Sequence, residues 1–210
     1  MYRPAQFAED RPEVLRALIR AAPFAHLVLA TEHGLEANGL PLLLREHDDG
    51  VTLVGHVARS NPIWRGEVRG EALAIFSGPQ GYVTPSAYPT KRVDGKVVPT
   101  WNYVLVHAHG TLRWVHDDEW LARLVTQLTD EHEAGRPNPW QVTDAPAPFI
   151  ASLRKAIVGF ELTVTRLEGK LKLGQNRTRA DREGVIDVLR AQGDEASAAL
   201  AEAMRAALDE

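Results

Sequence analysis

The sequence predicts a mainly β protein of the α+β class, in which an antiparallel β-barrel carries helices at its ends. Many short strand-like runs follow one another with few helices between them, unlike a parallel sheet built from βαβ units. Glycine, proline and polar residues separate these runs where turns are needed. The clearest helical periodicity lies outside the runs, at residues 14–19, 120–128 and beyond residue 179.

The first part of the chain is predicted to be one helix followed by three strands. Asp10 is expected to cap the helix with Pro12 in its first turn, and Pro23 is expected to end it. Pro41 indicates an edge strand or a bulge, because proline cannot donate a hydrogen bond to a neighbouring strand. The turn is expected at Asp48-Asp49-Gly50, and the strands at 25–31, 37–44 and 51–56.

The rest of the chain alternates between further strands and four helical segments. Ser60-Asn61-Pro62 predicts the start of a helix, and the polar residues 88–97 predict a mobile loop. An amphipathic helix is clearest at 117–130. Residues 100–115 are expected to form one long strand or a bent pair of strands. The remaining expected elements are strands at 72–76, 80–84, 157–167 and 171–173, a short helix ending at Lys155, and a helical tail at 179–210 broken near Gly193.

Composition excludes several classes of function. The 210 residues contain no cysteine, which rules out disulfides, thiol nucleophiles and cysteine metal ligands. Neither a signal peptide nor an apolar run long enough to cross a bilayer is visible, so we expect a cytoplasmic protein without membrane contact. The net charge is −4 and no segment has a convincing helix-turn-helix pattern, which makes direct DNA binding doubtful.

One candidate binding segment lies where a strand ends and a helix is expected to begin. Arg59 is a candidate for bidentate binding of an anionic phosphate, with Ser60 and Asn61 as neutral donors. The alternative is that Ser60 or Asn61 only caps the helix. His56, in the preceding strand, is compatible with metal ligation and also with a local hydrogen bond.

A second candidate segment combines aromatic and polar side chains. Thr100, Trp101 and Asn102 suit the edge and face of a flat heteroaromatic ring, although core packing is the alternative use. Lys170 and Lys172 share a strand face and form the best local basic cluster, unless that face is simply solvated.

Two histidines suggest a weaker possibility. His107 and His109 lie two residues apart in a predicted strand and therefore point to the same side. That spacing is compatible with a metal or a haem iron, but also with histidines that form local hydrogen bonds.

Several long motifs together resemble the PaiB-type FMN-binding negative transcriptional regulators. The resemblance extends over residues 1–190, and residues 191–210 form a helical tail without a family motif. One departure is Gly174, which stands where the usual KLSQNR pattern has a serine. The motifs, in chain order, are MYRPAQF, GHVARSNPIW, GPQGYVTPSAY, VPTWNYVLVHAHG, IVGFEL and KLKLGQNR.

The resemblance implies a split β-barrel that forms a homodimer with FMN in a groove between subunits. Carried onto this sequence, it makes Arg59, Ser60 and Asn61 candidates for the phosphate site, beside His56. It makes Thr100, Trp101 and Asn102 candidates for contacts with the flavin ring or its ribityl chain. The residues implied to complete the pocket are Lys172, Gln175 and Asn176.

Two classes of function follow from this resemblance. The first is an FMN-binding regulator that acts directly or through a partner. The second is a flavin-dependent reductase or oxidase of a small molecule, in which the cofactor carries the chemistry. Haem binding through a histidine is a weaker third reading.

Overall fold

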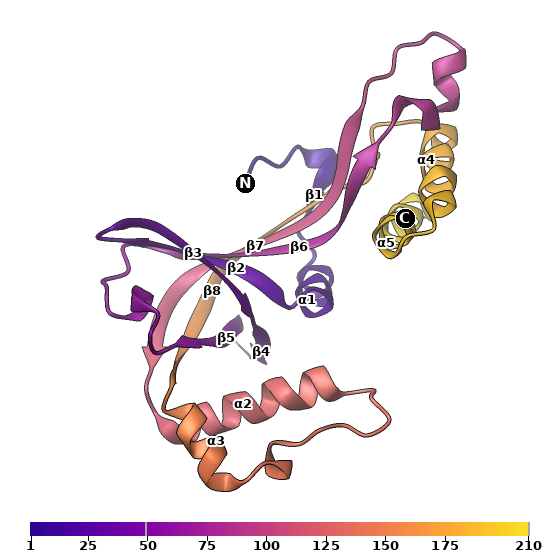
Figure 1. Cartoon of the computed structure of the whole chain (residues 1–210). Helices are drawn as coiled ribbons and strands as arrows, with labels where there is room; N and C mark the ends of the chain where they lie inside the picture. The colour runs from indigo at the N-terminus through magenta and orange to yellow at the C-terminus, as the bar shows by residue number, and fades with distance from the viewer. Residues whose placement is uncertain (49, 210) are drawn as a thin grey trace. The chain divides into compact units, whose positions relative to one another are not determined.

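The computed structural model describes residues 1–48 and 50–209 (Figure 1). Asp49, in the predicted turn, and Glu210, at the end of the predicted tail, lie outside the described residues. The strands form an antiparallel sheet in the order β3-β2-β6-β7-β8-β5-β4, and β1 pairs with β8. They are β1 (Ala8–Glu9), β2 (Phe24–Thr31), β3 (Gly34–Pro41), β4 (Leu43–His47), β5 (Gly50–Ala58), β6 (Ala72–Val83), β7 (Thr100–Val115) and β8 (Ile157–Lys172).

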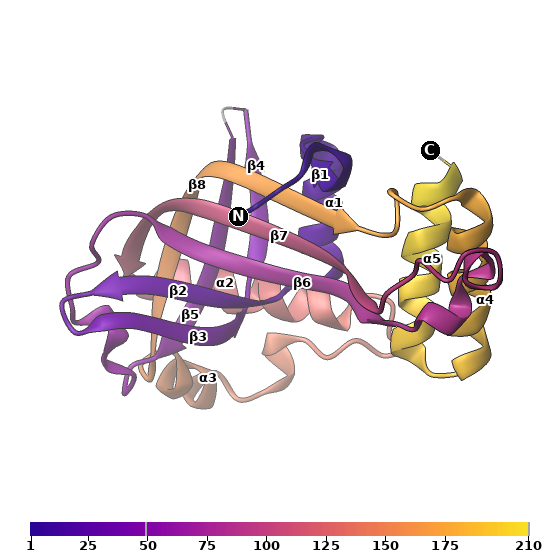
Figure 2. The ribbon, with the colours of Figure 1, turned by 90° about the horizontal axis from the view of Figure 1, so that it is seen from above.

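Helices flank the strands, and the chain is an α+β protein of the split-barrel type, as predicted (Figure 2). The α-helices are α1 (Pro12–Ala21), α2 (Asp118–Glu133), α3 (Ala147–Arg154), α4 (Arg179–Gln192) and α5 (Glu195–Asp209). Single 3-10 turns are η1 (Ala5–Phe7), η2 (Pro62–Trp64), η3 (Pro85–Ala87), η4 (Pro89–Arg92) and η5 (Val142–Asp144).

The chain folds into two compact units, and β6, β7 and β8 contribute residues to both. Unit 1 comprises Met1–Ala22, Phe76–His107 and Leu167–Glu210. Unit 2 comprises Pro23–Ile75 and Ala108–Arg166.

Unit 2 packs the amphipathic helix α2 against the strand pair β4–β5. Asp117 caps α2 by accepting a hydrogen bond from the backbone N–H of Trp120 at 2.6 Å. Leu124 and Leu128 on one face of α2 then pack with Leu43 and Val54 of the strands. The predicted helical stripe is therefore the surface that this unit buries.

Unit 1 is closed by α4 and α5, which pack against each other (Figure 1). Gly193 has φ +75°, a left-handed conformation that favours glycine, and it ends α4 where the sequence predicts a break. Leu200, Ala201 and Met204 of α5 are buried in one apolar cluster with residues of β6, β7 and α4. The division between a 1–190 domain and a 191–210 tail stays a prediction.

Two predicted breaks between strands are wrong. The glycine at each position lies inside a continuous strand, where it allows close packing and does not form a turn. Residues 72–76 and 80–83 belong to the single strand β6, and residue 84 follows its end; a Cβ on Gly78 would lie 3.0 Å from Val104. Residues 157–167 and 171–172 likewise belong to the single strand β8, and residue 173 follows its end; a Cβ on Gly169 would lie 2.3 Å from Leu15 Cδ2. In both strands glycine allows a neighbouring side chain to approach the backbone.

Three other expectations at element ends need correction. Asp10 does not cap α1; the cap position is Arg11, and the Asp10 carboxylate accepts a 2.6 Å bond from Arg3. The predicted strand 37–44 divides into β3 and β4, since Pro41 ends β3. The helix expected after Ser60 is only the 3-10 turn η2, because Gly66 and Gly70 follow closely and glycine disfavours helix.

Candidate functional site

Two of the predicted FMN-binding residues of unit 1, Thr100 and Trp101, contact the Lys172 ammonium group. Lys172 is the last residue of β8, and its Nζ donates to Thr100 Oγ1 at 2.6 Å and to the Trp101 carbonyl at 2.9 Å. An ammonium group has three N–H donors. One donor of the half-buried Lys172 is therefore left for an anion or a carbonyl oxygen of a ligand.

Trp101 and Tyr82 form an exposed aromatic surface in unit 1. The Trp101 side chain is 48% exposed, and its Nε1 donates to Gln80 Oε1 at 3.2 Å. The Tyr82 ring, 53% exposed, lies 6.4 Å from the Trp101 ring. Gln80 and Tyr82 were not among the predicted site residues, although they stand two apart in the GPQGYV motif and so share a strand face.

Asn102 points away from this surface, because neighbouring residues of a strand face opposite sides. It is 2% exposed, and its Nδ2 donates to Met204 Sδ of α5 at 3.4 Å. In this structure Asn102 contacts α5, while Thr100 and Trp101 are the members of the motif that contact Lys172.

The turn after β8 carries the remaining candidates of unit 1. Gln175 closes the turn: its Oε1 accepts from the backbone N–H of Leu173 at 2.8 Å, and its Nε2 donates to the Leu171 carbonyl at 2.6 Å. Asn176 is exposed. Gly174 has φ +85°, and this backbone conformation explains a glycine in place of serine.

In unit 2, Arg59 ties the end of β5 to the beginning of β8. Its Nε donates to the Lys155 carbonyl at 2.7 Å, and its Nη2 donates to the Ile157 carbonyl at 2.8 Å. Guanidinium has five N–H donors, so the Nη1 group and one Nη2 hydrogen are left for a ligand. The Nε–Nη2 edge of the guanidinium is therefore used within unit 2, and the Nη1–Nη2 edge remains for an anion.

The two residues after Arg59 differ in their contacts. Asn61 caps η2 by accepting from the backbone N–H of Ile63 at 3.1 Å, and its Nδ2 donates to Asn38 Oδ1 at 2.7 Å. This is the capping role that the sequence left open. Ser60 is exposed, and a phosphate role for either residue stays a prediction.

His56 lies in β5 and lines an apolar pocket of unit 2. Its Nδ1 atom is buried and has no hydrogen-bond partner within the described residues. Burial lowers the pKa of the His56 imidazole below its ordinary value, because the charged form loses hydration. The ring is therefore neutral near pH 7.

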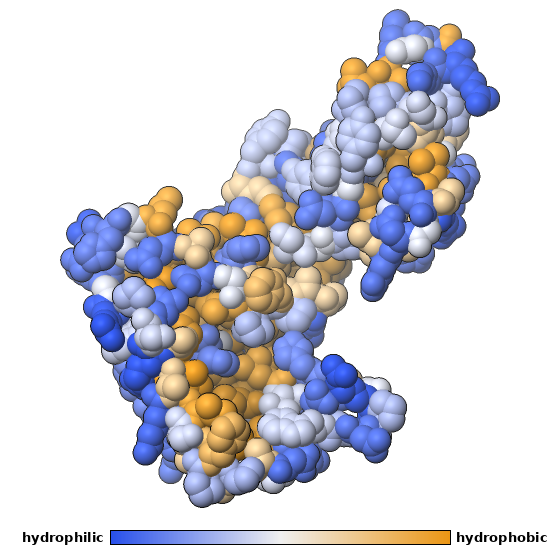
Figure 3. Space-filling model, in the orientation of Figure 1, coloured by the Kyte–Doolittle hydropathy of each residue, from blue (hydrophilic) through white to orange (hydrophobic). Residues whose placement is uncertain are grey.

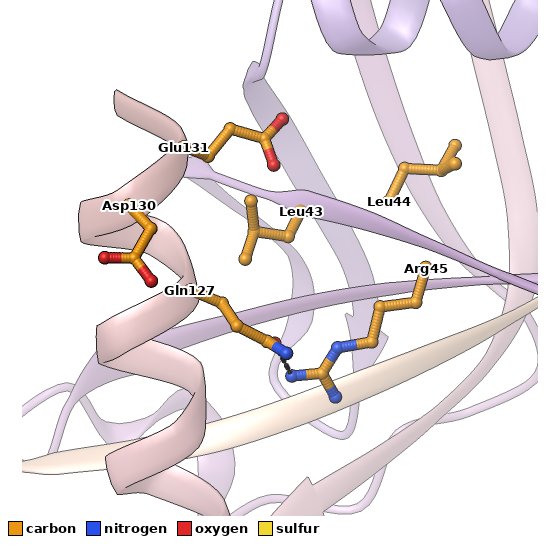
Figure 4. A pocket seen from close by; sticks show the side chains of 6 residues that line it. All are labelled: Leu43, Leu44, Arg45, Gln127, Asp130 and Glu131. Carbon is orange, nitrogen blue, oxygen red and sulfur yellow. Dashed lines mark hydrogen bonds between the residues drawn. The ribbon is translucent and has the colours of Figure 1, made fainter. Parts of the chain in front are cut away.

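A second hollow of unit 2, of about 370 Å³, lies between α2 and β4 (Figure 4). Arg45 Nη2 donates to Gln127 Oε1 there, and the Arg45 guanidinium lies 5.6 Å from the Trp120 ring. None of the FMN candidates is among the described residues that line this hollow, which are Leu43, Leu44, Arg45, Gln127, Asp130 and Glu131.

The chemistry of the candidate residues fits FMN. A phosphate needs cations or N–H groups with unused donors, and Lys172 and Arg59 each retain some after their internal bonds. A flavin ring needs an aromatic or apolar surface, which the exposed Trp101 offers. FMN, when bound, supplies hydride and electron transfer.

Residues 1–48 and 50–209 contain no helix that is both long enough and apolar enough to cross a membrane.

Comparison with known proteins places these observations in a family. A family model described as "Putative FMN-binding domain" matches residues 1–166. The protease synthase and sporulation protein PAI 2 of Bacillus subtilis is 33% identical over 206 residues, covering 97% of this chain and 96% of the relative. An uncharacterized protein of Emericella nidulans is 34% identical over 242 residues, covering 98% and 96%.

A solved structure supports the fold independently of sequence. The flavocytochrome Anf3 from Azotobacter vinelandii superposes with a TM-score of 0.58 at 16% identity, covering 85% of this chain and 72% of that one. At this identity the likeness concerns the fold alone. The family match and the B. subtilis relative show that the chain belongs to this family of FMN-binding proteins, and its cofactor is FMN.

Proposed function

We propose that Lys172, Thr100 and Trp101 hold FMN in unit 1. The observation that carries this is the Lys172 ammonium group, which is fixed by hydrogen bonds to the Thr100 hydroxyl and the Trp101 carbonyl and keeps a third donor. The Trp101 indole itself is exposed. Lys172 would bind an anionic or carbonyl oxygen of the cofactor, and Trp101 would contact the ring. FMN titration of the wild-type chain and Lys172→Met, followed by flavin fluorescence, tests the assignment; equal affinities would contradict it.

We further propose that the FMN-bound chain acts as a regulator of gene expression. The similar B. subtilis protein is named for protease synthesis and sporulation, which supports a regulatory role. With a net charge of −4, the chain lacks the overall positive charge that attracts DNA. Regulation would therefore pass through the flavin or a partner protein.

A DNA-binding titration tests the route of regulation. We expect no tight binding to genomic fragments at about 150 mM salt, where few phosphate contacts give weak affinity. Saturable, sequence-selective binding in the nanomolar range would instead support direct repression.

An FMN-dependent oxidoreductase is the alternative function, supported by the redox chemistry that the cofactor brings. The visible absorption spectrum of the purified protein would first distinguish bound flavin from haem. NADH or NADPH oxidation by the FMN-loaded protein would then separate the two functions: rapid turnover with a small-molecule acceptor supports the enzyme, and its absence supports the regulator.

We also propose that the chain forms a homodimer, the commonest symmetric assembly. The family resemblance supports a groove completed by a twofold partner. Light scattering should give twice the mass of 23.2 kDa; a monomer mass at micromolar concentration would contradict the proposal.

A further inference from the structure

The connection between β6 and β7 in unit 1 carries cations without an acidic partner. Lys91 and Arg92 of η4, and Lys96 beyond it, are all exposed. Lys91 Nζ donates to the Ser86 hydroxyl at 3.0 Å, which leaves its charge uncompensated. Within residues 1–48 and 50–209, none of these three cations forms an ion pair with a carboxylate. The positive charge of this connection is therefore available to a partner.

The connection is anchored to the start of α4. The backbone N–H and the hydroxyl of Thr90 donate to the buried Asp181 carboxylate, at 3.1 and 2.9 Å. The preceding residue but one, Tyr88, is buried, and the Arg177 guanidinium lies 5.0 Å from its ring. These two contacts fix η4 on α4. Little conformational entropy would therefore be lost when a partner binds to it.

Two exposed valines lie among the cations. Val93 is 83% exposed and Val98 is 63% exposed, whereas Val97 packs against the apolar cluster of unit 1. Asp94, the single acidic residue of the segment, accepts a 2.9 Å bond from the backbone N–H of Lys96 and so closes a turn. Figure 3 shows hydrophilic side chains over this end of unit 1, with separate hydrophobic ones between them. We call the following residues the basic–apolar surface: Lys91, Arg92, Val93, Lys96 and Val98.

We propose that the basic–apolar surface docks an acidic segment of a partner protein that also carries aliphatic side chains. Carboxylates of the partner complement the uncompensated cations, and its aliphatic groups cover the two valines. A nucleic acid fits less well, because its phosphate backbone offers the valines no apolar contact and the net charge of −4 repels it. This proposal rests on the regulatory function proposed above, since it names the chemistry of the partner through which regulation would pass.

The test uses the FMN-loaded full chain and fluorescein-labelled probes, followed by anisotropy at about 150 mM salt. The probes are a peptide of alternating glutamate and leucine, its counterpart with serine for leucine, and a short DNA duplex. We expect saturable binding of the glutamate–leucine peptide, with the serine counterpart at least about fivefold weaker because it buries no apolar surface. Val93→Ser should reduce this difference between the two peptides.

Charge reversal then locates the binding surface. Arg92→Glu combined with Lys96→Glu should weaken the glutamate–leucine peptide at least about tenfold, because attraction becomes repulsion. The matched control is Arg69→Glu in unit 2, since Arg69 is exposed and has no acidic partner among the described residues; its affinity for the peptide should stay within about twofold of the wild type. Both substitutions lie at exposed positions, so the melting temperature should change by less than about 2 °C.

Three results would overturn the proposal. They are equal weakening by the control and the charge-reversed variant, the absence of saturable peptide binding to the wild type, and tighter saturable binding of the duplex than of the peptide. Flavin fluorescence of the same samples reports FMN binding separately. A wild-type chain that binds FMN but not the peptide would therefore refute the docking surface and leave the FMN assignment standing.

Discussion

Lys172 of unit 1 and Arg59 of unit 2 are both candidate cations for FMN, but their internal bonds differ. Lys172 bonds to Thr100 and Trp101, two residues of the neighbouring strand that are themselves candidates for FMN contact. Arg59 bonds to the carbonyls of Lys155 and Ile157, where α3 passes into β8. Lys172 therefore bonds only to other candidate residues of the binding surface, whereas Arg59 joins segments of unit 2 that are distant in sequence.

This difference shows why the positive charge that two residues share is a poor guide to their separate roles. Arginine forms two bonds in a fixed plane and can bridge two carbonyls with one edge while another edge stays available. The lysine ammonium is a point charge on a flexible chain, and its donors rotate to suit a ligand. We therefore expect substitutions of Arg59 to change stability and binding together, and substitutions of Lys172 to change binding alone.

Arg59→Ala should have the largest effect. Loss of two charged hydrogen bonds, partly replaced by water, should lower the free energy of unfolding by about 1–2 kcal/mol, or roughly 2–8 °C in melting temperature. If Arg59 also contacts phosphate, FMN affinity should fall at least about tenfold while riboflavin affinity changes little. Thermal melts and titrations with both flavins measure the two effects.

Arg59→Lys is the matched control for this substitution, because it keeps the charge and loses the planar fork. It should reproduce much of the stability loss and retain part of the preference for FMN. Equal weakening of FMN and riboflavin in Arg59→Ala would show that Arg59 has only the structural role.

Lys172→Met should weaken FMN binding by about tenfold, since it removes one charge-assisted hydrogen bond to the cofactor. The methionine chain keeps similar bulk, so the melting temperature of the free protein should change by less than about 2 °C. Lys91→Met is a control, because Lys91 is exposed and bonds only to Ser86 among the described residues. A large loss of stability in Lys172→Met would erase the contrast with Arg59.

Gly174→Ser restores the residue of the usual family pattern beside Lys172. Space is available, because a Cβ would lie 3.5 Å from Arg182 Cγ and 3.7 Å from Met204 Cε. The cost comes from φ +85°, which a residue with a Cβ rarely adopts, and should be about 1 kcal/mol in the free energy of unfolding. Chemical denaturation measures it; a stabilised variant would contradict the backbone explanation, and tighter FMN binding would show that the hydroxyl contributes to the site.

Thr100→Val should have the smallest effect. It removes one acceptor of the Lys172 ammonium and keeps the shape of the side chain, so FMN affinity should fall by about threefold as the ammonium becomes less well positioned. The control is Thr126→Val, on the exposed face of α2. Thr90→Val is not suitable as a control, because Thr90 bonds the buried Asp181. Unchanged affinity would show that Thr100 does not orient Lys172.

The sequence by itself determined the elements whose periodicity is long and uniform. Strand β7 has the predicted bounds 100–115, and α2 buries the predicted apolar stripe, because repeated local choices agree over many residues. The family motifs also lead to the FMN-binding family, since several long motifs in one order rarely coincide by chance. Gly193 breaks the helical tail as expected, because a single left-handed residue suffices to end a helix.

Only the tertiary structure decided what single residues do inside those elements. Gly78 and Gly169 sit within continuous strands because distant side chains approach them, a reason that no local pattern contains. Asn102 follows Trp101 in one motif yet meets α5, since strand residues alternate between faces and α5 covers one of them. The burial of His56 Nδ1 likewise depends on segments far apart in sequence, because packing, and not spacing, decides which polar atoms lose contact with water.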